Sequence, residues 1–310
     1  MIEKIKYENH EEWLSIRSKY IGGSDAGAVV GLNPYKSAYA LWAEKTGKVP
    51  GFEGNLTTKV GAYLEELVAK LFEEETGKKV QRMNTSIHNT DYPYAIANID
   101  RKVIGEKALL EIKTTNSIPI MKQLRGTEFP EAYYAQVVHY LAVTGLEKAY
   151  LAVLVNCREL KIYELERDQA EIDALMGAED AFWKLVESDT PPAVDGSDST
   201  GDTLLSMYPA STGEEVDLFA FNTDLDEYMA LNAQIKALKA LKDEKANIIK
   251  EYMKEAGKGI SERYRVSYKS SEKKTFDVDR FEAEHKDIDL SEYYKYTITR
   301  AFKVTKKGDK

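Results

Sequence analysis

Residues 94–114 constrain the fold of this chain more than any other segment, because they have the pattern of two adjacent strands joined by a tight turn. We expect strands over residues 94–104 and 107–114, which are bounded by turn-forming residues. Gly105-Glu106 lies between them and suits a two-residue hairpin turn with glycine at its first position. The segment therefore predicts an antiparallel hairpin.

The register of this hairpin decides which side chains face each other. The two-residue turn pairs Ile104 with Lys107, and the same register sets Asp100 opposite Glu111. The Cβ atoms of direct cross-strand neighbours lie about 5 Å apart. The sequence therefore predicts that two carboxylates meet across the strand pair.

The second strand separates its side chains onto two faces. One face carries Ala108, Leu110 and Ile112, and the other carries Leu109, Glu111 and Lys113. A carboxylate and an amine thus lie side by side on a strand that is otherwise suited to burial.

Opposed carboxylates repel each other, and a divalent cation removes that cost. Oxygen ligands alone suit Mg²⁺ or Mn²⁺. Lys113 beside such an ion could orient or deprotonate a water molecule, or neutralise charge that grows on a phosphate. The alternative is a surface strand whose acids pair with Lys102, Lys107 and Lys113.

Glycine and proline residues divide the rest of the chain into elements. Helices are expected at residues 26–30, 38–46, 57–76, 131–144, 168–188 and 225–256. Further strands are expected at residues 149–155, 159–165, 263–269 and 296–304. Residues 190–215 are rich in Asp, Ser, Thr, Gly and Pro, so we expect a linker or long loop there. The predicted domains are therefore residues 1–215 and 216–310.

Two of these helices have distinctive apolar patterns. The helix at 57–76 has an apolar arc formed by Val60, Tyr63, Leu64, Leu67, Val68, Leu71 and Phe72. Glu65 lies at the edge of that arc, where it either looks inward or extends to solvent. The helix at 225–256 keeps near-heptad apolar spacing and needs a partner. An oligomer contact, a partner protein, a hairpin arm and packing on its own domain all remain open.

Two further groups of residues are candidates for a site. Gln136 and Tyr140 lie one turn apart on a predicted helix and share a face, whereas His139 is expected to be a core histidine. Arg17 and Ser24 flank a Gly-Gly turn at a helix start, an arrangement that suits a phosphate. The alternative is a simple helix cap at Ser24 and a surface charge at Arg17.

Composition excludes several classes of protein. The single cysteine, Cys157, excludes a disulfide framework, a cysteine-rich zinc site and an iron–sulfur cluster. The charged start of the chain lacks the apolar core of a signal peptide, and no run of about 18 apolar residues occurs. We therefore expect a cytoplasmic protein with no membrane partner.

Six motifs in order resemble the YqaJ-type phage recombination nucleases, relatives of lambda exonuclease within the PD-(D/E)XK superfamily. They span about residues 13–192 and read IGGSDAGAVVGLNPYKSAYALWAEKTG, GAYLEELVAKLFEEETG, ANIDRKV, LLEIKTT, AQVVHYLAVTG and FWKLV followed by PP. The resemblance implies an α/β (α+β) fold with a restriction-endonuclease-like core, in which helices flank a central mixed sheet. A long carboxyl-terminal helix and a small β segment would extend this core.

The resemblance also assigns roles to individual residues. It implies metal-binding acids at Asp100, Glu111 and Glu65, a further metal ligand in the main-chain carbonyl of Ile112, a catalytic lysine at Lys113, supporting residues at Gln136 and Tyr140, and a 5′-phosphate clamp at Arg17 and Ser24. The chain departs from the common pattern at Ile99, where many relatives have proline. It departs again at Arg101, where a small residue is common, and Arg101 could alter the mouth of the site.

The implied activity is Mg²⁺-dependent hydrolysis of DNA by an exonuclease of phage or prophage recombination. One or two Mg²⁺ ions are expected, with Mn²⁺ as a substitute, and linear duplex would be degraded from its 5′ end. The alternatives are an endonuclease or RecB-like nuclease on the same fold, and an inactive scaffold that binds DNA ends. Expected partners are double-stranded DNA ends, a single-strand annealing protein and further copies of the chain, with a trimeric ring favoured. The expected location is the cytoplasm of a bacterial host.

A net charge of −9 argues against DNA binding when the chain is taken as a whole, but the acid is concentrated in one segment. Residues 169–227 hold 1 basic and 15 acidic side chains. The preceding residues hold 22 basic and 23 acidic side chains, and the following residues hold 20 basic and 14 acidic ones. We therefore expect the acid of residues 169–227 to face away from any path taken by DNA.

Overall fold

The computed structural model describes residues 1–310 except 53, 125–128, 297–298 and 307–310. The chain forms two compact units, Met1–Tyr208 and Pro209–Lys310. Among the described residues, no helix combines the length and the apolar character needed to cross a membrane.

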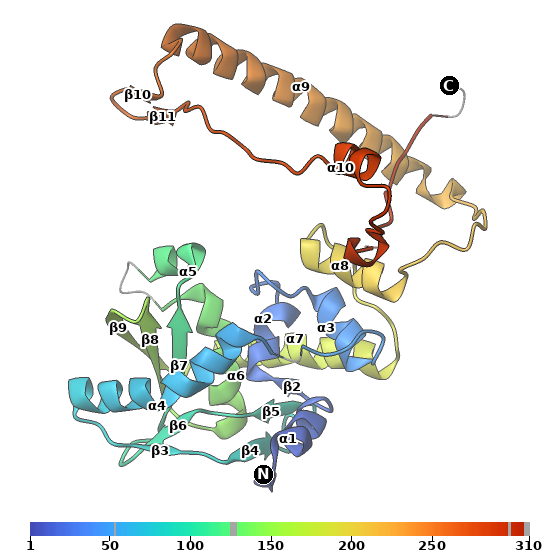
Figure 1. Ribbon diagram of the computed structural model, residues 1–310. Coiled ribbons are helices and arrows are strands. Elements are labelled where there is room, and N and C mark those ends of the chain that lie inside the picture. The colour runs from blue at the N-terminus through green and yellow to red at the C-terminus, as the bar shows by residue number, and fades with distance from the viewer. Residues whose placement is uncertain (53, 125–128, 297–298, 307–310) are drawn as a thin grey trace. The chain divides into compact units, whose positions relative to one another are not determined.

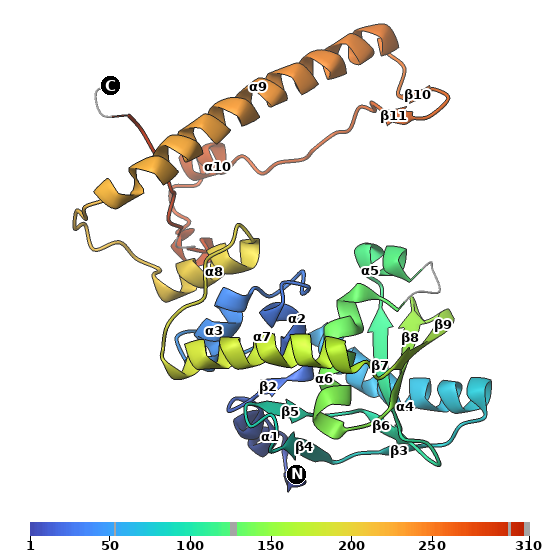
Figure 2. The ribbon, with the colours of Figure 1, turned by 180° about the vertical axis from the view of Figure 1, so that it is seen from behind.

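Two mixed sheets form the centre of the first unit (Figures 1 and 2). The first sheet has the order β1-β4-β5-β2 and contains β1 (Ile2–Lys6), β2 (Ile21–Gly22), β4 (Thr85–Asn89) and β5 (Ala95–Ala97). The second sheet has the order β3-β6-β7-β8-β9 and contains β3 (Val80–Arg82), β6 (Arg101–Val103), β7 (Ala108–Thr115), β8 (Lys148–Val155) and β9 (Glu159–Glu166). Among the strand pairs of the described residues, β2–β5 and β7–β8 are parallel and the others are antiparallel.

The helices of the first unit surround these sheets (Figures 1 and 2). They are α1 (His10–Arg17), α2 (Gly23–Val29), α3 (Ala38–Lys45), α4 (Leu56–Thr76), α5 (Ile118–Gln123), α6 (Glu131–Thr144), α7 (Gln169–Glu187) and α8 (Asp198–Met207). Because β7 and β8 are parallel, the chain between them has to cross over, and it does so through α5 and α6.

Strand β7 separates two apolar cores, as its alternation predicted. Ala108, Leu110 and Ile112 pack with Val68, Ala69 and Phe72 of α4. Leu109 belongs to the larger core that contains buried residues of α6 and α7. The face that carries Glu111 is therefore the α6 face of the sheet.

The predicted strand at 94–104 is wrong as a single element. Its residues form β5 in the first sheet and β6 in the second, and Asn98, Ile99 and Asp100 lie between the two strands. The register of the hairpin is confirmed, because Arg101 pairs with Leu110 and Lys102 pairs with Leu109. Asp100 thus lies one residue before β6, where the chain passes from one sheet to the other.

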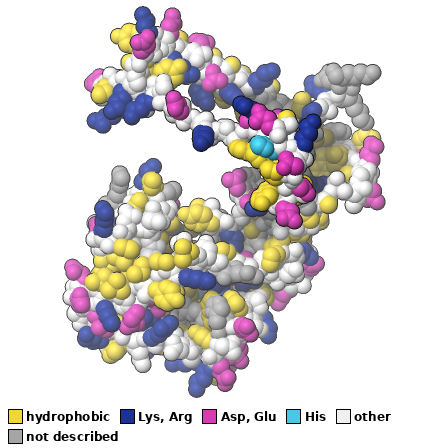
Figure 3. Space-filling model, viewed as in Figure 1, with side chains coloured by type: hydrophobic (Ala, Val, Ile, Leu, Met, Phe, Trp, Pro, Cys, Tyr) yellow, Lys and Arg dark blue, Asp and Glu magenta, His cyan; other side chains and the backbone are white. Residues whose placement is uncertain are grey.

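The apolar arc of α4 is buried over only part of its length. Val68 and Phe72 are buried, but Val60, Tyr63 and Leu67 are 44%, 85% and 47% exposed. Figure 3 shows hydrophobic side chains gathered on this face of the molecule over α4. The core with β7 and β8 uses only the later turns of the helix.

A helix interrupts the predicted linker. Ser197 caps α8 by accepting a hydrogen bond from the Thr200 amide, and the buried Thr200 hydroxyl donates to Ser37 at the start of α3 (2.9 Å). Polar capping and docking residues gave this segment the composition of a loop. The first unit consequently ends at Tyr208, seven residues before the expected domain boundary at 215.

The second unit contains the long helix α9 (Asn222–Met253) and a hairpin of β10 (Lys258–Ile260) and β11 (Arg265–Ser267). A short helix, α10 (Val278–Glu284), follows. Met253 is the buried residue of α9, whereas Leu231, Ile235 and Leu238 are more than half exposed. The strand expected at 296–304 is absent from residues 296 and 299–304, and residues 297–298 lie outside the described part of the chain.

Candidate active site

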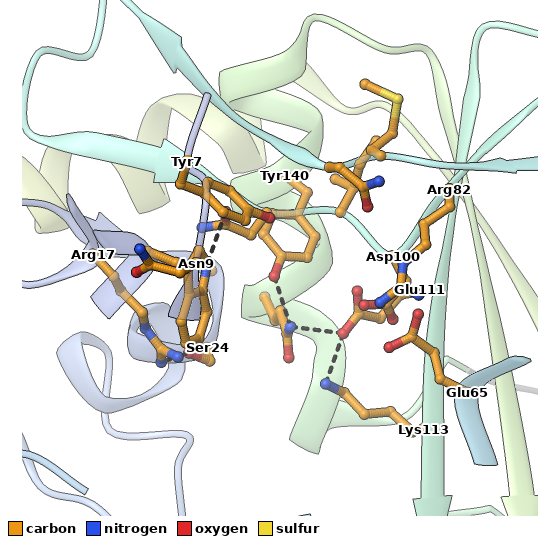
Figure 4. A pocket seen from close by; sticks show the side chains of 18 of the residues that line it. Tyr7, Asn9, Arg17, Ser24, Glu65, Arg82, Asp100, Glu111, Lys113 and Tyr140 are labelled. Atoms are coloured by element: carbon orange, nitrogen blue, oxygen red, sulfur yellow. Dashed lines mark hydrogen bonds and ion pairs between the residues drawn. The ribbon is translucent and has the colours of Figure 1, made fainter. Parts of the chain in front are cut away.

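A pocket of about 700 Å³ opens where the two sheets of the first unit meet α1, α2, α4 and α6 (Figure 4). Of the predicted site residues, its lining includes Arg17, Ser24, Glu65, Asp100, Glu111, Lys113, Gln136 and Tyr140. They come from separate elements, so the fold brings together groups that the sequence had linked only by pattern.

Asp100 and Glu111 form the acidic centre of the pocket. The Ile112 amide donates a hydrogen bond to Asp100 Oδ2 (2.8 Å), which ties the residue before β6 to the middle of β7. Burial, followed by the charge of Glu111, raises the pKa of Asp100 well above its ordinary value. The metal-free protein therefore holds two buried carboxylates that oppose each other's ionisation.

Glu111 is only partly satisfied by its neighbours. Its Oε1 atom lies 2.6 Å from Lys113 Nζ and accepts a hydrogen bond from Gln136 Nε2 (2.7 Å). Its Oε2 atom is buried and has no hydrogen-bond partner. An unpartnered oxygen on a buried carboxylate is costly unless another group completes it. The donor set therefore fits a hard divalent cation.

Lys113 is a cation at this site. Burial disfavours its charged form, but the carboxylates of Glu111 and Asp100 outweigh that effect and raise the pKa of Lys113. Its Nζ atom also lies 5.8 Å from the ring centroid of Tyr133. In the absence of a bound cation, the Lys113 ammonium is therefore charged and lies beside the Glu111 carboxylate.

Glu65 lies at the same pocket but is held by another group. Its Oε1 atom accepts a hydrogen bond from Arg101 NH1 (2.5 Å). Across residues 1–52, 54–124, 129–296 and 299–306, no three His, Cys, Asp or Glu side chains are grouped closely enough to hold a metal ion. Asp100 and Glu111 thus form a two-carboxylate centre, and metal binding by Glu65 and by the Ile112 carbonyl stays a prediction.

Gln136 connects the acidic centre to Tyr140. Besides its bond to Glu111, Gln136 Nε2 donates to the Tyr140 hydroxyl (3.0 Å). The Tyr140 ring packs on α2, where a Cβ atom added to Gly23 would lie 2.4 Å from Tyr140 Cε1. Glycine is therefore required at position 23 for close approach, a reason that the sequence pattern of a turn did not reveal.

Arg17 and Ser24 form a second polar centre in the pocket, as the sequence had paired them. Arg17 NH2 donates to Ser24 Oγ (2.5 Å), and the guanidinium carbon lies 5.2 Å from the ring centroid of Trp13. Ser24 is not the cap of α2, since the cap residue is Gly22, whose amide donates to Asp25 Oδ2 (3.2 Å). The Ser24 hydroxyl is thus directed to Arg17.

Asp25 and Lys45 were missed as a supporting pair. Lys45 Nζ lies 2.9 Å from Asp25 Oδ2 and donates to the main-chain carbonyls of Arg17 (3.2 Å) and Tyr20 (2.6 Å). Although burial opposes ionisation, the charges of Lys45 and Arg17 lower the pKa of Asp25. Lys45 and Asp25 thus bind the main chain of the segment between Arg17 and Ser24 and hold it in place. The pair could not be predicted, because no local sequence pattern links residues from two different helices.

The remaining wall of the pocket was also missed. It includes Tyr7, Asn9, Trp13, Arg82, Asn84 and Asn98, which come from α1, from the chain between β1 and α1, and from the chain around β3 and β5. These elements are short or charged, so their sequences carried little periodic signal. None of the described residues that line the pocket comes from residues 169–208, the part of the acidic segment within this unit.

His139 is the core histidine that the sequence predicted. It is fully buried, its Nδ1 atom lies 2.8 Å from Glu179 Oε1 on α7, and its Nε2 atom lies 3.0 Å from the Ile96 carbonyl on β5. Burial disfavours the charged ring, but the Glu179 carboxylate outweighs it and raises the pKa of His139. The pair holds α6, and with it Gln136, against α7 and the first sheet.

We expect His139→Gln to lower the free energy of unfolding by about 3–5 kcal/mol, because it leaves Glu179 buried without its charged partner. A histidine with a raised folded-state pKa stabilises fully below its unfolded-state pKa, near 6.5, and this contribution is lost as the pH rises through the folded-state value. Urea unfolding at several pH values should therefore show a smaller loss of stability above neutral pH in the variant than in the wild type. An unchanged pH dependence contradicts this role, and the exposed His285→Gln is the control.

Comparison with known proteins identifies close relatives. A model of the YqaJ-like viral recombinase domain matches residues 12–147. The uncharacterized protein YqaJ of Bacillus subtilis (strain 168) is 37% identical over 294 residues, which cover 93% of this chain and 92% of YqaJ. A segment of 38 residues is 50% identical to protein D345L of African swine fever virus and covers 12% of this chain and 11% of that protein.

The solved structures support the fold. The alkaline exonuclease LHK-Exo of Laribacter hongkongensis, in complex with dAMP, matches with a TM-score of 0.50 and 20% identity. The match covers 58% of this chain and 94% of LHK-Exo. The predicted α/β (α+β) fold class with flanking helices is therefore confirmed, although the strands form two mixed sheets where one central sheet was expected.

Proposed function

Because the chain belongs to the YqaJ-like viral recombinase domain family, we propose that it is a metal-dependent DNA exonuclease of phage or prophage recombination. The observation that carries the proposal is the meeting of Asp100, Glu111 and Lys113, with Glu111 Oε2 left without a partner. A bound Mg²⁺ ion would supply Lewis-acid activation of a phosphate and a water molecule. Asp100 and Glu111 are the residues proposed to hold it, with the Ile112 carbonyl as a further ligand. Glu65 would join them only after its release from Arg101.

The residues around the acidic centre have distinct proposed roles. Lys113 places a positive charge beside Glu111 and neutralises charge that develops on the scissile phosphate. Gln136 fixes the Glu111 carboxylate through its Oε1 atom and is itself fixed by Tyr140. Preorganised groups of this kind do not have to reorient during the reaction.

Arg17 and Ser24 are proposed to bind the terminal 5′-phosphate of the DNA. A guanidinium offers several donors to phosphate oxygens, and the hydroxyl beside it adds another. They line the same pocket as Lys113, so a bound end would extend toward the acidic centre. From this pairing we infer degradation of a linear duplex in the 5′ to 3′ direction, which leaves a 3′ single-stranded tail.

The test uses purified protein, Mg²⁺ and one DNA sequence in two forms, linear duplex and covalently closed circle. An exonuclease releases nucleotides from the linear form alone. Cutting of the circle would favour an endonuclease or RecB-like activity. Failure to bind Mn²⁺ in isothermal titration, with no digestion, would instead favour a scaffold that binds DNA ends.

We expect Arg17→Ala to remove the preference for 5′-phosphorylated ends over 5′-hydroxyl ends. Loss of one charge-assisted contact to phosphate should reduce the rate on phosphorylated ends by about 10-fold to 100-fold and change the rate on hydroxyl ends much less. The measurement is the ratio of initial rates on the two duplexes. Lys19→Ala, which removes an exposed lysine two residues away, is the matched control. An undiminished ratio in Arg17→Ala contradicts the phosphate role.

The partners follow from the same proposal. We propose double-stranded DNA ends as substrate, a single-strand annealing protein as the recipient of the 3′ tail, and a ring of identical chains, with three copies, around the DNA. The proposed place of action is the cytoplasm of the bacterial host. The exposed apolar side chains of α9, such as Leu231, Ile235 and Leu238, are available for a contact between chains or with a partner protein.

A further inference from the structure

Arg101 is a buried cation that the proposed reaction does not use. Its side chain is 3% exposed, and its NH1 group donates to Glu65 Oε1 (2.5 Å) and to the Asp100 carbonyl (2.8 Å). Its NH2 group donates to Glu66 Oε2 (3.0 Å). One guanidinium therefore engages two successive carboxylates of α4 and the main chain of a proposed metal ligand.

The strand geometry explains why Arg101 reaches Glu65. Successive side chains of a strand point to opposite faces, so Arg101 projects away from the face on which Asp100 meets Glu111. Arg101 pairs with Leu110, whose side chain packs against α4. The guanidinium thus emerges under α4, next to Glu65.

Glu65 is consequently already paired with one positive charge, the Arg101 guanidinium. Its carboxylate lines the pocket with Asp100 and Glu111, but its Oε1 atom is already bound to a cation that belongs to the chain. A divalent ion that recruits Glu65 has to compete with the guanidinium for it. Arg101 also explains why the acidic centre contains two carboxylates rather than three.

We propose that Arg101 competes with a divalent cation for Glu65. As long as the Arg101–Glu65 ion pair is intact, the divalent cation is bound by the carboxylates of Asp100 and Glu111 alone. This inference rests on the proposed metal-dependent function and concerns which residue sets the affinity for the cation. Replacement of Arg101 by a neutral residue releases Glu65 and adds a full negative charge to the site. The variant should therefore bind divalent cations more tightly.

The experiment is isothermal titration of the full chain with Mn²⁺. We expect Arg101→Gln to bind Mn²⁺ about tenfold more tightly than the wild type, a coupling typical of two ligands that compete through one group. Lys102→Gln is the matched control, because it removes the same charge from the next residue of β6, which is exposed. It should change the affinity by less than about twofold.

Glu65→Gln provides the second arm, and its measurement in the wild-type background does not depend on the folding of the Arg101 variant. If Arg101 sequesters Glu65, Glu65→Gln should lower Mn²⁺ affinity by less than about twofold in the wild-type background and by about tenfold in the Arg101→Gln background. A merely structural role of Arg101 would change the melting temperature but not this difference.

The outcomes separate this inference from the function on which it rests. Equal Mn²⁺ affinity in Arg101→Gln and the wild type overturns the role of Arg101. A tenfold loss in Glu65→Gln alone also overturns it, since Glu65 would then be a ligand despite Arg101. If the wild type binds no Mn²⁺ at all, the metal-dependent function itself is contradicted.

Discussion

Lys113→Ala is expected to slow the release of nucleotides from linear duplex DNA by about a thousandfold, the scale seen when one preorganised charge or donor is removed from a transition state. The ammonium lies 2.6 Å from Glu111 Oε1, and its raised pKa keeps it charged. No other lysine lines the described part of the pocket. The rate should fall at saturating substrate, because the contact is proposed to matter most when charge grows on the phosphate.

The matched control is Lys161→Ala. Lys161 lies on β9 opposite Val153, the residue that pairs with Lys113 on β7, so both lysines occupy the same row of the sheet. Lys161 pairs with Glu159 and is absent from the pocket lining. Its loss should change the rate by less than about twofold. Full activity of Lys113→Ala would contradict the assigned role.

Asp100→Asn is expected to abolish both Mn²⁺ binding and digestion, while it stabilises the metal-free protein. The amide keeps an acceptor for the Ile112 amide but removes the charge that burial and Glu111 disfavour. Each 1 kcal/mol of buried repulsion that is removed should raise the melting temperature by about 2–4 °C for a folded unit of the size of Met1–Tyr208. Nuclease assays, titration calorimetry and thermal unfolding without metal provide the three measurements.

Two comparisons complete this test. Asp91→Asn removes a carboxylate that is 75% exposed, so it should leave activity and melting temperature unchanged. Added Mn²⁺ should raise the melting temperature of the wild type but not that of Asp100→Asn, because binding to the folded state alone stabilises it. A metal-free Asp100→Asn protein that is less stable than the wild type would show that the two carboxylates do not repel each other.

Local patterns were sufficient to predict much of the fold. Helices α4 and α6 end where glycines with φ of +71° and +67°, Gly77 and Gly145, adopt the left-handed conformation, and these residues marked both ends in the sequence. The hairpin register followed from the Gly105 turn and alternation, so Asp100 and Glu111 could be paired without a structure. These features depend on interactions between residues that are close together in the chain, so a sequence pattern is sufficient to predict them.

What the sequence could not reveal depends on contacts between distant segments. Residues 94–104 contain nothing that marks a change of sheet at Asn98. The change is set by the strands that pair with β5 in the first sheet and with β6 in the second. The partner of Arg101 is 36 residues away in the chain, and the contact of Lys45 with Arg17 spans 28 residues. Charged residues at such separations have many candidate partners, and only the packed fold selects among them.

The most direct test of the central claim is a time course with one plasmid, supplied with Mg²⁺ both as a covalently closed circle and as a linear duplex with 5′-phosphorylated ends. We expect the wild type to release nucleotides from the linear form, to leave the circle intact and to lose activity when the metal is chelated. Cutting of the circle, or digestion that continues in the chelator, would contradict a metal-dependent exonuclease.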